Sequence, residues 1–135
     1  MSRVIQNGLP VLLVIVALMF GGHGCMTWKW TSFDWVNDST ETIRVEDVSG
    51  FSELVEPGKL RPGTGPDSVG LNFGDPVDVE RQIVIRWKIG DEHHEQILTR
   101  DECGLSKRLN GVTVRFIYQP DGKWRIEKIA STERP

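Results

Sequence analysis

The chain has 135 residues, of which 39% are hydrophobic and 26% charged, and its formal net charge is −3 at pH 7. A chain of this length forms one compact domain. Nucleic-acid-binding proteins carry a basic footprint, so this acidic balance excludes nucleic acid as an expected partner.

The first 24 residues have the features of an export signal. Arg3 gives a positive start, and residues 9–20 carry no charged or polar side chain. A positive start, an apolar stretch of about 7–15 residues and small residues at the cleavage site define a secretory signal peptide. The sequence therefore predicts an apolar helix, which is either a cleaved signal peptide over residues 1–24 or a retained membrane anchor.

This segment closes on Gly22-His23-Gly24-Cys25. A glycine directly before a cysteine at this place resembles the lipobox of bacterial lipoproteins, where cleavage leaves a lipid-modified cysteine as the first residue. The resemblance covers the signal segment only, and no family is identified for residues 26–135. It implies that Cys25 carries palmitate-type acyl chains, which together anchor a protein stably. The domain would then be held in the cell envelope, facing the periplasm or the exterior.

Cys103 is the second of the two cysteines. If Cys25 carries a lipid, Cys103 has no partner and is expected to be a small buried residue. If the protein is instead freely secreted, an oxidising compartment favours a disulfide between them. A catalytic thiol is not expected, because the acidic neighbours Asp101 and Glu102 raise a thiol pKa.

Alternating apolar and polar residues, the pattern of half-buried strands, begin soon after Cys25. Residues 27–37 and residues 42–48 are expected to pair as an N-terminal hairpin across a cluster of turn-forming residues. The spacing of the aromatic residues in the first of these segments predicts a bulge near Ser32.

Trp28 and Trp30 follow Cys25 at short distance along the chain. Tryptophan is favoured at the membrane interface, so both are candidates for contact with lipid headgroups. The alternative is that both pack in the core. In either case the domain is expected to sit close to the bilayer.

Residues 57–76 form a region rich in proline and glycine. A loop of this length in a compact domain is commonly functional or disordered, so it is the candidate binding loop. A short strand is expected within it at Val69, Leu71 and Phe73.

The clearest strand covers residues 81–89, whose alternate apolar side chains share one face. A glycine turn joins it to residues 94–99 as a hairpin. Further strands are expected at residues 112–118 and, after a Pro-Asp-Gly turn, from Trp124 onward. Trp87 and Trp124 are expected to anchor the core.

The fold class that follows is all-β. Six or seven short strands separated by turns are typical of a small antiparallel β-sandwich, Ig-like in general architecture, or of a barrel. Residues 25–135 are expected to form this single extracytoplasmic domain behind the N-terminal apolar helix.

No residue pattern in the chain indicates a cofactor, a metal or a nucleophile. His93 and His94 are adjacent, and neighbours on a strand point to opposite faces, so they are read as a solvated hairpin tip rather than a metal site. The characteristic motifs of hydrolases and of phosphate-binding loops are not found. The protein is therefore expected not to be an enzyme.

Basic residues fall on the outward phase of three predicted strands. If those strands are neighbours, they form either a solvated sheet face with Glu127 and other carboxylates interleaved, or a basic face that contacts phospholipid headgroups or an anionic envelope polymer. The residues concerned are Arg86, Lys88, Arg115 and Arg125.

The expected function is that of a membrane-tethered envelope lipoprotein, a non-catalytic module that binds a protein or glycan. Two alternatives remain open. The first is a structural envelope lipoprotein without a specific ligand. The second is a small hydrolase with a carboxylate pair, because such pairs leave no fixed spacing in sequence.

Overall fold

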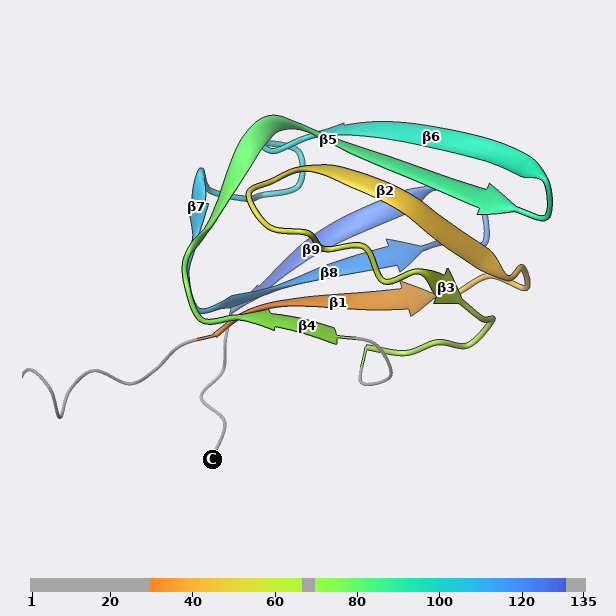
Figure 1. Cartoon of the computed structure of the whole chain (residues 1–135), viewed down its shortest axis with the longest axis horizontal. Coiled ribbons are helices and arrows are strands. Elements are labelled where there is room, and N and C mark those ends of the chain that lie inside the picture. The colour runs from red at the N-terminus through yellow and green to blue at the C-terminus, as the bar shows by residue number, and fades with distance from the viewer. Residues whose placement is uncertain (1–29, 67–69, 131–135) are drawn as a thin grey trace, which may run out of the picture.

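A computed structural model describes residues 30–66 and 70–130 of the chain. The expected signal segment, with Cys25 and Trp28, lies outside the described residues. Every regular element of the described part is a β-strand, and no helix able to span a membrane is found there. The strands form two sheets that face each other and do not close into a barrel (Figure 1). The all-β prediction is confirmed, and the barrel alternative is wrong.

The first sheet, called here the β1 sheet, has the strand order β4-β1-β8-β9. The strand β1 lies between an antiparallel and a parallel neighbour, since it runs antiparallel to β4 and parallel to β8. The parallel pair departs from the wholly antiparallel arrangement expected from the sequence. The members of this sheet are β1 (Thr31–Asn37), β4 (Gly70–Phe73), β8 (Val112–Tyr118) and β9 (Trp124–Ala130).

The second sheet, called here the β5 sheet, has the strand order β3-β2-β5-β6, and β7 pairs with the start of β5. All pairs in this sheet are antiparallel. The expected hairpin of residues 81–89 with residues 94–99 is confirmed as β5 and β6. The members are β2 (Ile43–Phe51), β3 (Lys59–Leu60), β5 (Val77–Ile89), β6 (Glu92–Thr99) and β7 (Arg108–Leu109).

The expected N-terminal hairpin is wrong, because β1 and β2 belong to different sheets. The crossing between the sheets is held by Asn37, whose side chain is buried. Its Nδ2 donates hydrogen bonds to the carbonyl oxygens of Glu41 and Leu60, at 2.7 and 3.1 Å. The expected bulge near Ser32 is also not formed, since the register of β1 with β8 is unbroken.

The bulge in this fold lies in β2 instead. The register with β5 shifts by one residue between Val45 and Asp47. An extra residue in one strand changes which side chains face the core. As a result both Val45 and Val48 are buried, although their spacing of three breaks the alternation of an ideal strand.

A second irregularity of β2 lies between Ser49 and Phe51. Gly50 sits there with φ of 110°, a conformation that favours glycine. A Cβ atom at this position would lie 2.5 Å from the carbonyl oxygen of Gln82. The backbones of β2 and β5 therefore approach each other where only glycine fits.

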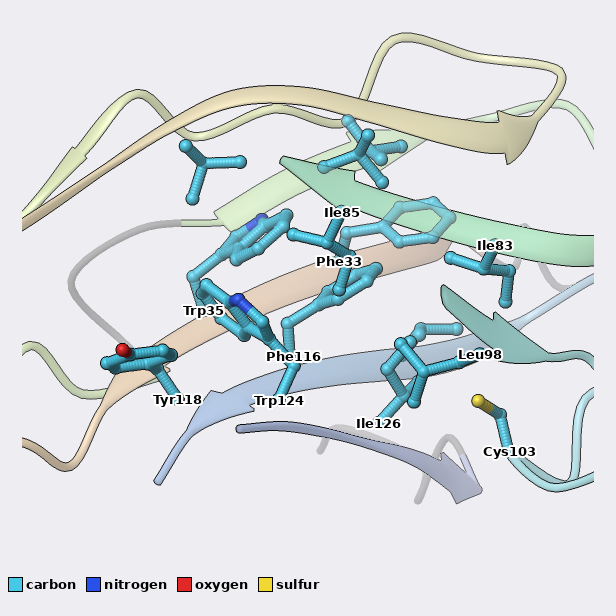
Figure 2. Packing of buried hydrophobic residues seen from close by; sticks show 14 of the residues in the cluster. Phe33, Trp35, Ile83, Ile85, Leu98, Cys103, Phe116, Tyr118, Trp124 and Ile126 are labelled. Atoms are coloured by element: carbon cyan, nitrogen blue, oxygen red, sulfur yellow. The ribbon is translucent and has the colours of Figure 1, made fainter. Parts of the chain in front are cut away.

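The core between the sheets is largely aromatic (Figure 2). Trp35 stacks on Phe116 with ring centroids 4.1 Å apart, and it meets Trp124 edge-to-face at 5.4 Å. Trp87 also contacts Trp124 nearly at right angles, at 5.9 Å. Both Trp87 and Trp124 are buried, as the sequence predicts. Among the described residues, the buried indole N–H groups of Trp35 and Trp124 have no hydrogen-bond acceptor.

The region of residues 57–76 is not one open loop. It contributes β3 to the β5 sheet and β4 to the β1 sheet, so it crosses between the sheets. The short strand expected at Val69, Leu71 and Phe73 is confirmed as β4 for Leu71 and Phe73, whose side chains pack against the core, and Val69 lies outside the described residues.

Candidate functional site

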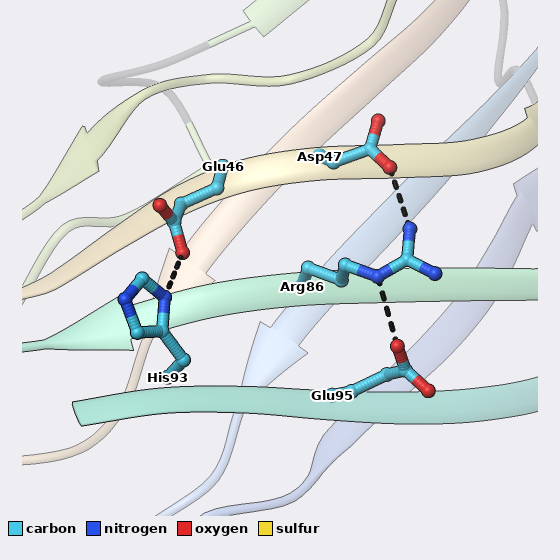
Figure 3. Close-up of polar contacts among 5 residues, drawn as sticks. All are labelled: Glu46, Asp47, Arg86, His93 and Glu95. Carbon is cyan, nitrogen blue, oxygen red and sulfur yellow. Dashed lines mark hydrogen bonds and ion pairs between the residues drawn. The ribbon is translucent and has the colours of Figure 1, made fainter.

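The outer face of the β5 sheet carries the densest group of charged side chains described in the chain. Near its middle, Arg86 lies between two carboxylates (Figure 3). Its Nη1 is 2.8 Å from Asp47 Oδ2, and its Nε is 2.8 Å from Glu95 Oε2. The hydrogen bond that Arg86 donates to Glu95 is the main cause that raises the pKa of Arg86 above its ordinary value. In this acid–base–acid row, named the Arg86 row, the arginine is paired with two carboxylates and the formal charges sum to −1.

The β2 bulge determines how Glu46 takes part in this face. Glu46 and Asp47 are consecutive, yet both contact partners on the outer surface. Glu46 Oε1 lies 2.8 Å from Nδ1 of His93 on β6, two strands away (Figure 3). The bulge thus allows two consecutive carboxylates to act on the same face, Glu46 toward His93 and Asp47 toward Arg86.

The next row of cross-strand neighbours, toward the β5–β6 turn, consists of basic side chains. The strand register places Arg44 of β2 opposite Lys59 of β3 on one side and opposite Lys88 of β5 on the other. Adjacent strands lie about 4.8 Å apart, so the three backbones are close neighbours. The side chains Lys59, Arg44 and Lys88, named the basic row, therefore stand side by side across three strands.

The basic row has little compensation from acidic groups. Among the described residues, no carboxylate lies within ion-pair distance of Arg44 or Lys59. Lys88 Nζ is 4.0 Å from Asp91, at the limit of an ion pair, and the Asp91 side chain is fully exposed. Like charges directly opposite each other destabilise a sheet. The basic row is therefore an unfavourable arrangement for the unliganded protein.

A shallow hollow of about 170 Å³ lies over the basic row. Small-molecule sites usually enclose about 300–1,000 Å³, so this hollow does not enclose a compact ligand. It is lined by Thr42, Ile43, Arg44, Lys59, Lys88 and Gly90.

A second hollow, of about 390 Å³, lies beside the bend of β5 and is lined by Arg81, Gln82, Thr99, Arg100 and Asp101. One of its two arginines has a structural role, because Nη1 of Arg100 donates to the carbonyl oxygen of Val79 at 3.0 Å. This hollow also has a carboxylate, Asp101, in its lining, whereas no acidic residue lines the hollow over the basic row.

The basic face expected from the sequence is not formed. Arg86 and Lys88 lie on the β5 sheet, whereas Arg115 and Arg125 lie on the β1 sheet. Arg115 Nη2 is 3.2 Å from Asp34, and Arg125 is paired with Glu127. Strand alternation predicts which side chains point outward, but it does not say which sheet a strand joins.

Two members of the basic row, Arg44 and Lys59, were not among the expected site residues. Arg44 lies in a segment whose alternation was visible in the sequence. Lys59 lies in a strand of two residues inside the proline- and glycine-rich region. A strand that short leaves no periodic pattern, so no sequence signal pointed to it.

The adjacent histidines point to opposite faces, as expected. His93 is on the outer face with Glu46, and His94 stacks on Trp87 with ring centroids 5.4 Å apart. Nε2 of His94 also lies 3.1 Å from Glu92. Within residues 30–66 and 70–130, no group of three metal-ligating side chains is found.

Cys103 is buried and is a free thiol in the described part of the chain. Burial, and secondarily the charge of Glu102, raises its pKa to about 11. Trp30, directly before β1, is 51% exposed, so the core alternative is wrong for this residue. Its place at the membrane interface, and the lipidation of Cys25, stay predictions.

The chain enters the fold at the end away from the basic row (Figure 1). Thr31 begins β1 at one end of the molecule, while Lys59 and Lys88 lie at the other, near the β5–β6 turn. A strand of seven residues spans about 20 Å. The basic row is therefore displaced by about that distance from the point where an N-terminal tether would attach.

Comparison with known proteins gave no match: no family model, no curated protein and no solved structure matches this chain.

Proposed function

We propose that the protein is a membrane-tethered lipoprotein of the cell envelope and acts as a non-catalytic module that binds a protein or glycan. Its scaffold is a small β-sandwich, Ig-like in general architecture. The observation that carries the proposal is the basic row, which has little acidic compensation and lies at the end of the fold opposite the chain entry. A tethered domain with this layout presents its cations away from its own anchor.

The tether follows from the sequence. Cys25 precedes Thr31 by six residues, which span at most about 22 Å when extended. Trp30 is half exposed directly before β1, where an amphipathic ring is suited to the membrane interface. The domain is thus held close to the bilayer by the end that begins β1.

Binding is favoured over hydrolysis by the state of the carboxylates on this face. Asp47 and Glu95 approach the same point, which is the requirement for a carboxylate pair. Each of them is bonded to the guanidinium of Arg86. Both carboxylates hold the side chain of Arg86 in place, and this supports a structural role in the sheet surface rather than acid–base chemistry.

The anchor is tested by the intact mass of the protein extracted from membranes of cells that express the full chain. The expected mass is that of residues 25–135 plus a lipid. Cys25→Ser is the control and is expected to lose the lipid. An unmodified chain that starts at Met1 in the native protein contradicts the lipoprotein proposal.

The binding role is tested by capture of partners from envelope extracts with the full chain in zwitterionic vesicles. A specific protein or glycan is expected with the native chain and not with Arg44→Gln. Capture of no specific partner by either chain would favour the structural lipoprotein without a ligand, and equal specific capture by both would contradict binding through the basic row.

A further inference from the structure

We infer that the basic row is a binding site for a linear polyanion that lies across the strands, with its phosphate or carboxylate groups held in turn by Lys59, Arg44 and Lys88. This inference rests on the proposed binding role and names its ligand class. It does not depend on the lipid at Cys25.

The geometry favours a chain of charges over a single anion. The three cations come from adjacent strands, so their backbones repeat at about 4.8 Å across the sheet. Lys59 and Lys88 are therefore about 10 Å apart at the backbone. A polymer with several oxyanions can pair each cation with its own anionic group, whereas a single phosphate would have to draw the two lysine side chains together over Arg44.

The shape of the surface also favours a linear polyanion over a compact ligand. The hollow over the row measures about 170 Å³ and is open, so it is too small to enclose a sugar phosphate or a nucleotide. It matches one charged unit of a longer molecule that continues over the flat sheet. The outer face of a sheet places no wall at either end of such a molecule.

The side-chain types suit an oxyanion ligand. Arg44 is central, and its planar guanidinium binds a carboxylate or phosphate through two parallel hydrogen bonds. The flanking lysines supply mobile point charges that adapt to the spacing of the polymer. His93, opposite Lys88 on β6, is already held by Glu46, so the row of available cations ends at Lys88.

The charge pattern separates this row from the rest of the face. One step along the same sheet, Arg86 has two carboxylates within 2.8 Å. Carboxylates at the corresponding positions beside Arg44 would remove the repulsion, and the chain has lysines there instead. An anionic ligand provides the compensation that Arg44 and Lys59 lack within the described part of the chain.

The test uses the full chain reconstituted in phosphatidylcholine vesicles, with polygalacturonate and polyphosphate as probes and inorganic phosphate as the monomeric comparison. At low salt, at least one polymer is expected to bind much more tightly than inorganic phosphate, and the binding is expected to weaken as salt rises. Arg44→Gln is expected to weaken it by at least about tenfold. The two polymers distinguish phosphate from carboxylate as the source of the charge.

The matched control is Arg125→Gln, which removes the same charge from an exposed arginine on the other sheet. It is expected to change the affinity by less than about twofold. Equal losses in Arg44→Gln and Arg125→Gln would show that only net charge matters, and this would overturn the inference. Failure of both polymers to bind would overturn it as well.

A last measurement uses vesicles that contain phosphatidylglycerol and distinguishes an anionic membrane from a polymer as the ligand. Binding of Arg44-containing protein to added anionic vesicles, with neither polymer bound, would show that the row contacts a membrane and would overturn the polyanion site. An unlipidated Cys25 together with Arg44-dependent polymer binding would contradict the anchor and leave the site intact. The two proposals therefore fail in distinguishable ways.

Discussion

Arg86 and Arg44 stand on the same outer face of the β5 sheet, one row apart, and have opposite surroundings. Arg86 lies between Asp47 and Glu95, and Arg44 lies between Lys59 and Lys88. Cross-strand pairs of opposite charge stabilise a sheet and pairs of like charge destabilise it. The same residue type thus holds neighbouring strands together in one row and leaves charge uncompensated in the next. This contrast separates a row that serves the fold from a row available to a ligand.

The largest loss in the free energy of unfolding is expected from Gly50→Ala, because it disturbs the contact between β2 and β5, which carry members of both rows. The new Cβ would lie 2.5 Å from the Gln82 carbonyl oxygen, and alanine is strained at a φ of 110°. We expect a loss of about 2–4 kcal/mol in the free energy of unfolding, measured with urea. Gly58→Ala is the control, because φ is 81° there but the space is open. Equal losses in both variants would show that the close approach of β2 and β5 is unimportant.

A smaller effect is expected from Gln96→Leu. The Gln96 amide accepts from the backbone N–H of Trp124 at 2.7 Å and donates to its carbonyl oxygen at 3.0 Å, so it joins the edge strand β6 to the edge strand β9. The loss of both bonds is expected to cost about 1–2 kcal/mol in urea unfolding. Because β6 carries Glu95 but no member of the basic row, polyanion binding is expected to persist. Loss of polyanion binding in Gln96→Leu would show that the basic row depends on β6, the strand that carries Glu95 of the Arg86 row.

Arg44→Gln and Arg86→Gln are expected to change stability in opposite directions. Removing Arg44 relieves repulsion from two lysines, and we expect a gain of up to about 0.2–1 kcal/mol at low salt. Removing Arg86 leaves two carboxylates without their shared partner, and a lower urea midpoint is expected. If both variants shift the midpoint in the same direction, the contrast between the rows is wrong.

The smallest effect is expected from mild alkali, which weakens the core without changing either row. The pKa of Cys103 is raised to about 11 in the fold, so the thiol of the unfolded chain ionises first as pH rises. This contribution to stability is complete below the unfolded pKa of about 9 and is lost as pH rises toward 11. The melting temperature of Cys103→Ala is expected to fall less between pH 8 and 9.5 than that of the native chain. A parallel fall in both would show that Cys103 is not the cause.

The sequence predicts the strands of this fold far better than their partners. Residues 81–89 alternate so clearly that β5, its buried Trp87 and its hairpin with β6 were all expected. The pairing of β1 was not, because β1 lies beside β8, and their contact between Asp34 and Arg115 joins residues 81 positions apart. Local alternation carries no information about such distant neighbours.

In the candidate site, too, the orientation of a side chain was predictable and its cross-strand neighbours were not. The outward phase of Lys88 was correctly predicted, and its neighbours were not, because Arg44 and Lys59 become adjacent only through the sheet register. The bulge at Val45 and Asp47 was also invisible, since the two acidic residues 46 and 47 read as ordinary polar positions. Sites built across strands depend on tertiary pairing, which a single sequence does not encode locally.

The parallel pairing of β1 with β8 has a consequence for the time at which this protein folds. If the chain is exported from its N-terminus, as proposed, β1 emerges first, but it can complete its sheet only after β8, some 80 residues later, has emerged. Contacts of such high sequence separation form slowly. Until β8 emerges, β1 would have β4 as its only partner in the sheet, and the edge that β8 later covers would stay open. Under the proposed export, the order in which the strands emerge would therefore differ from the order in which this sheet is completed.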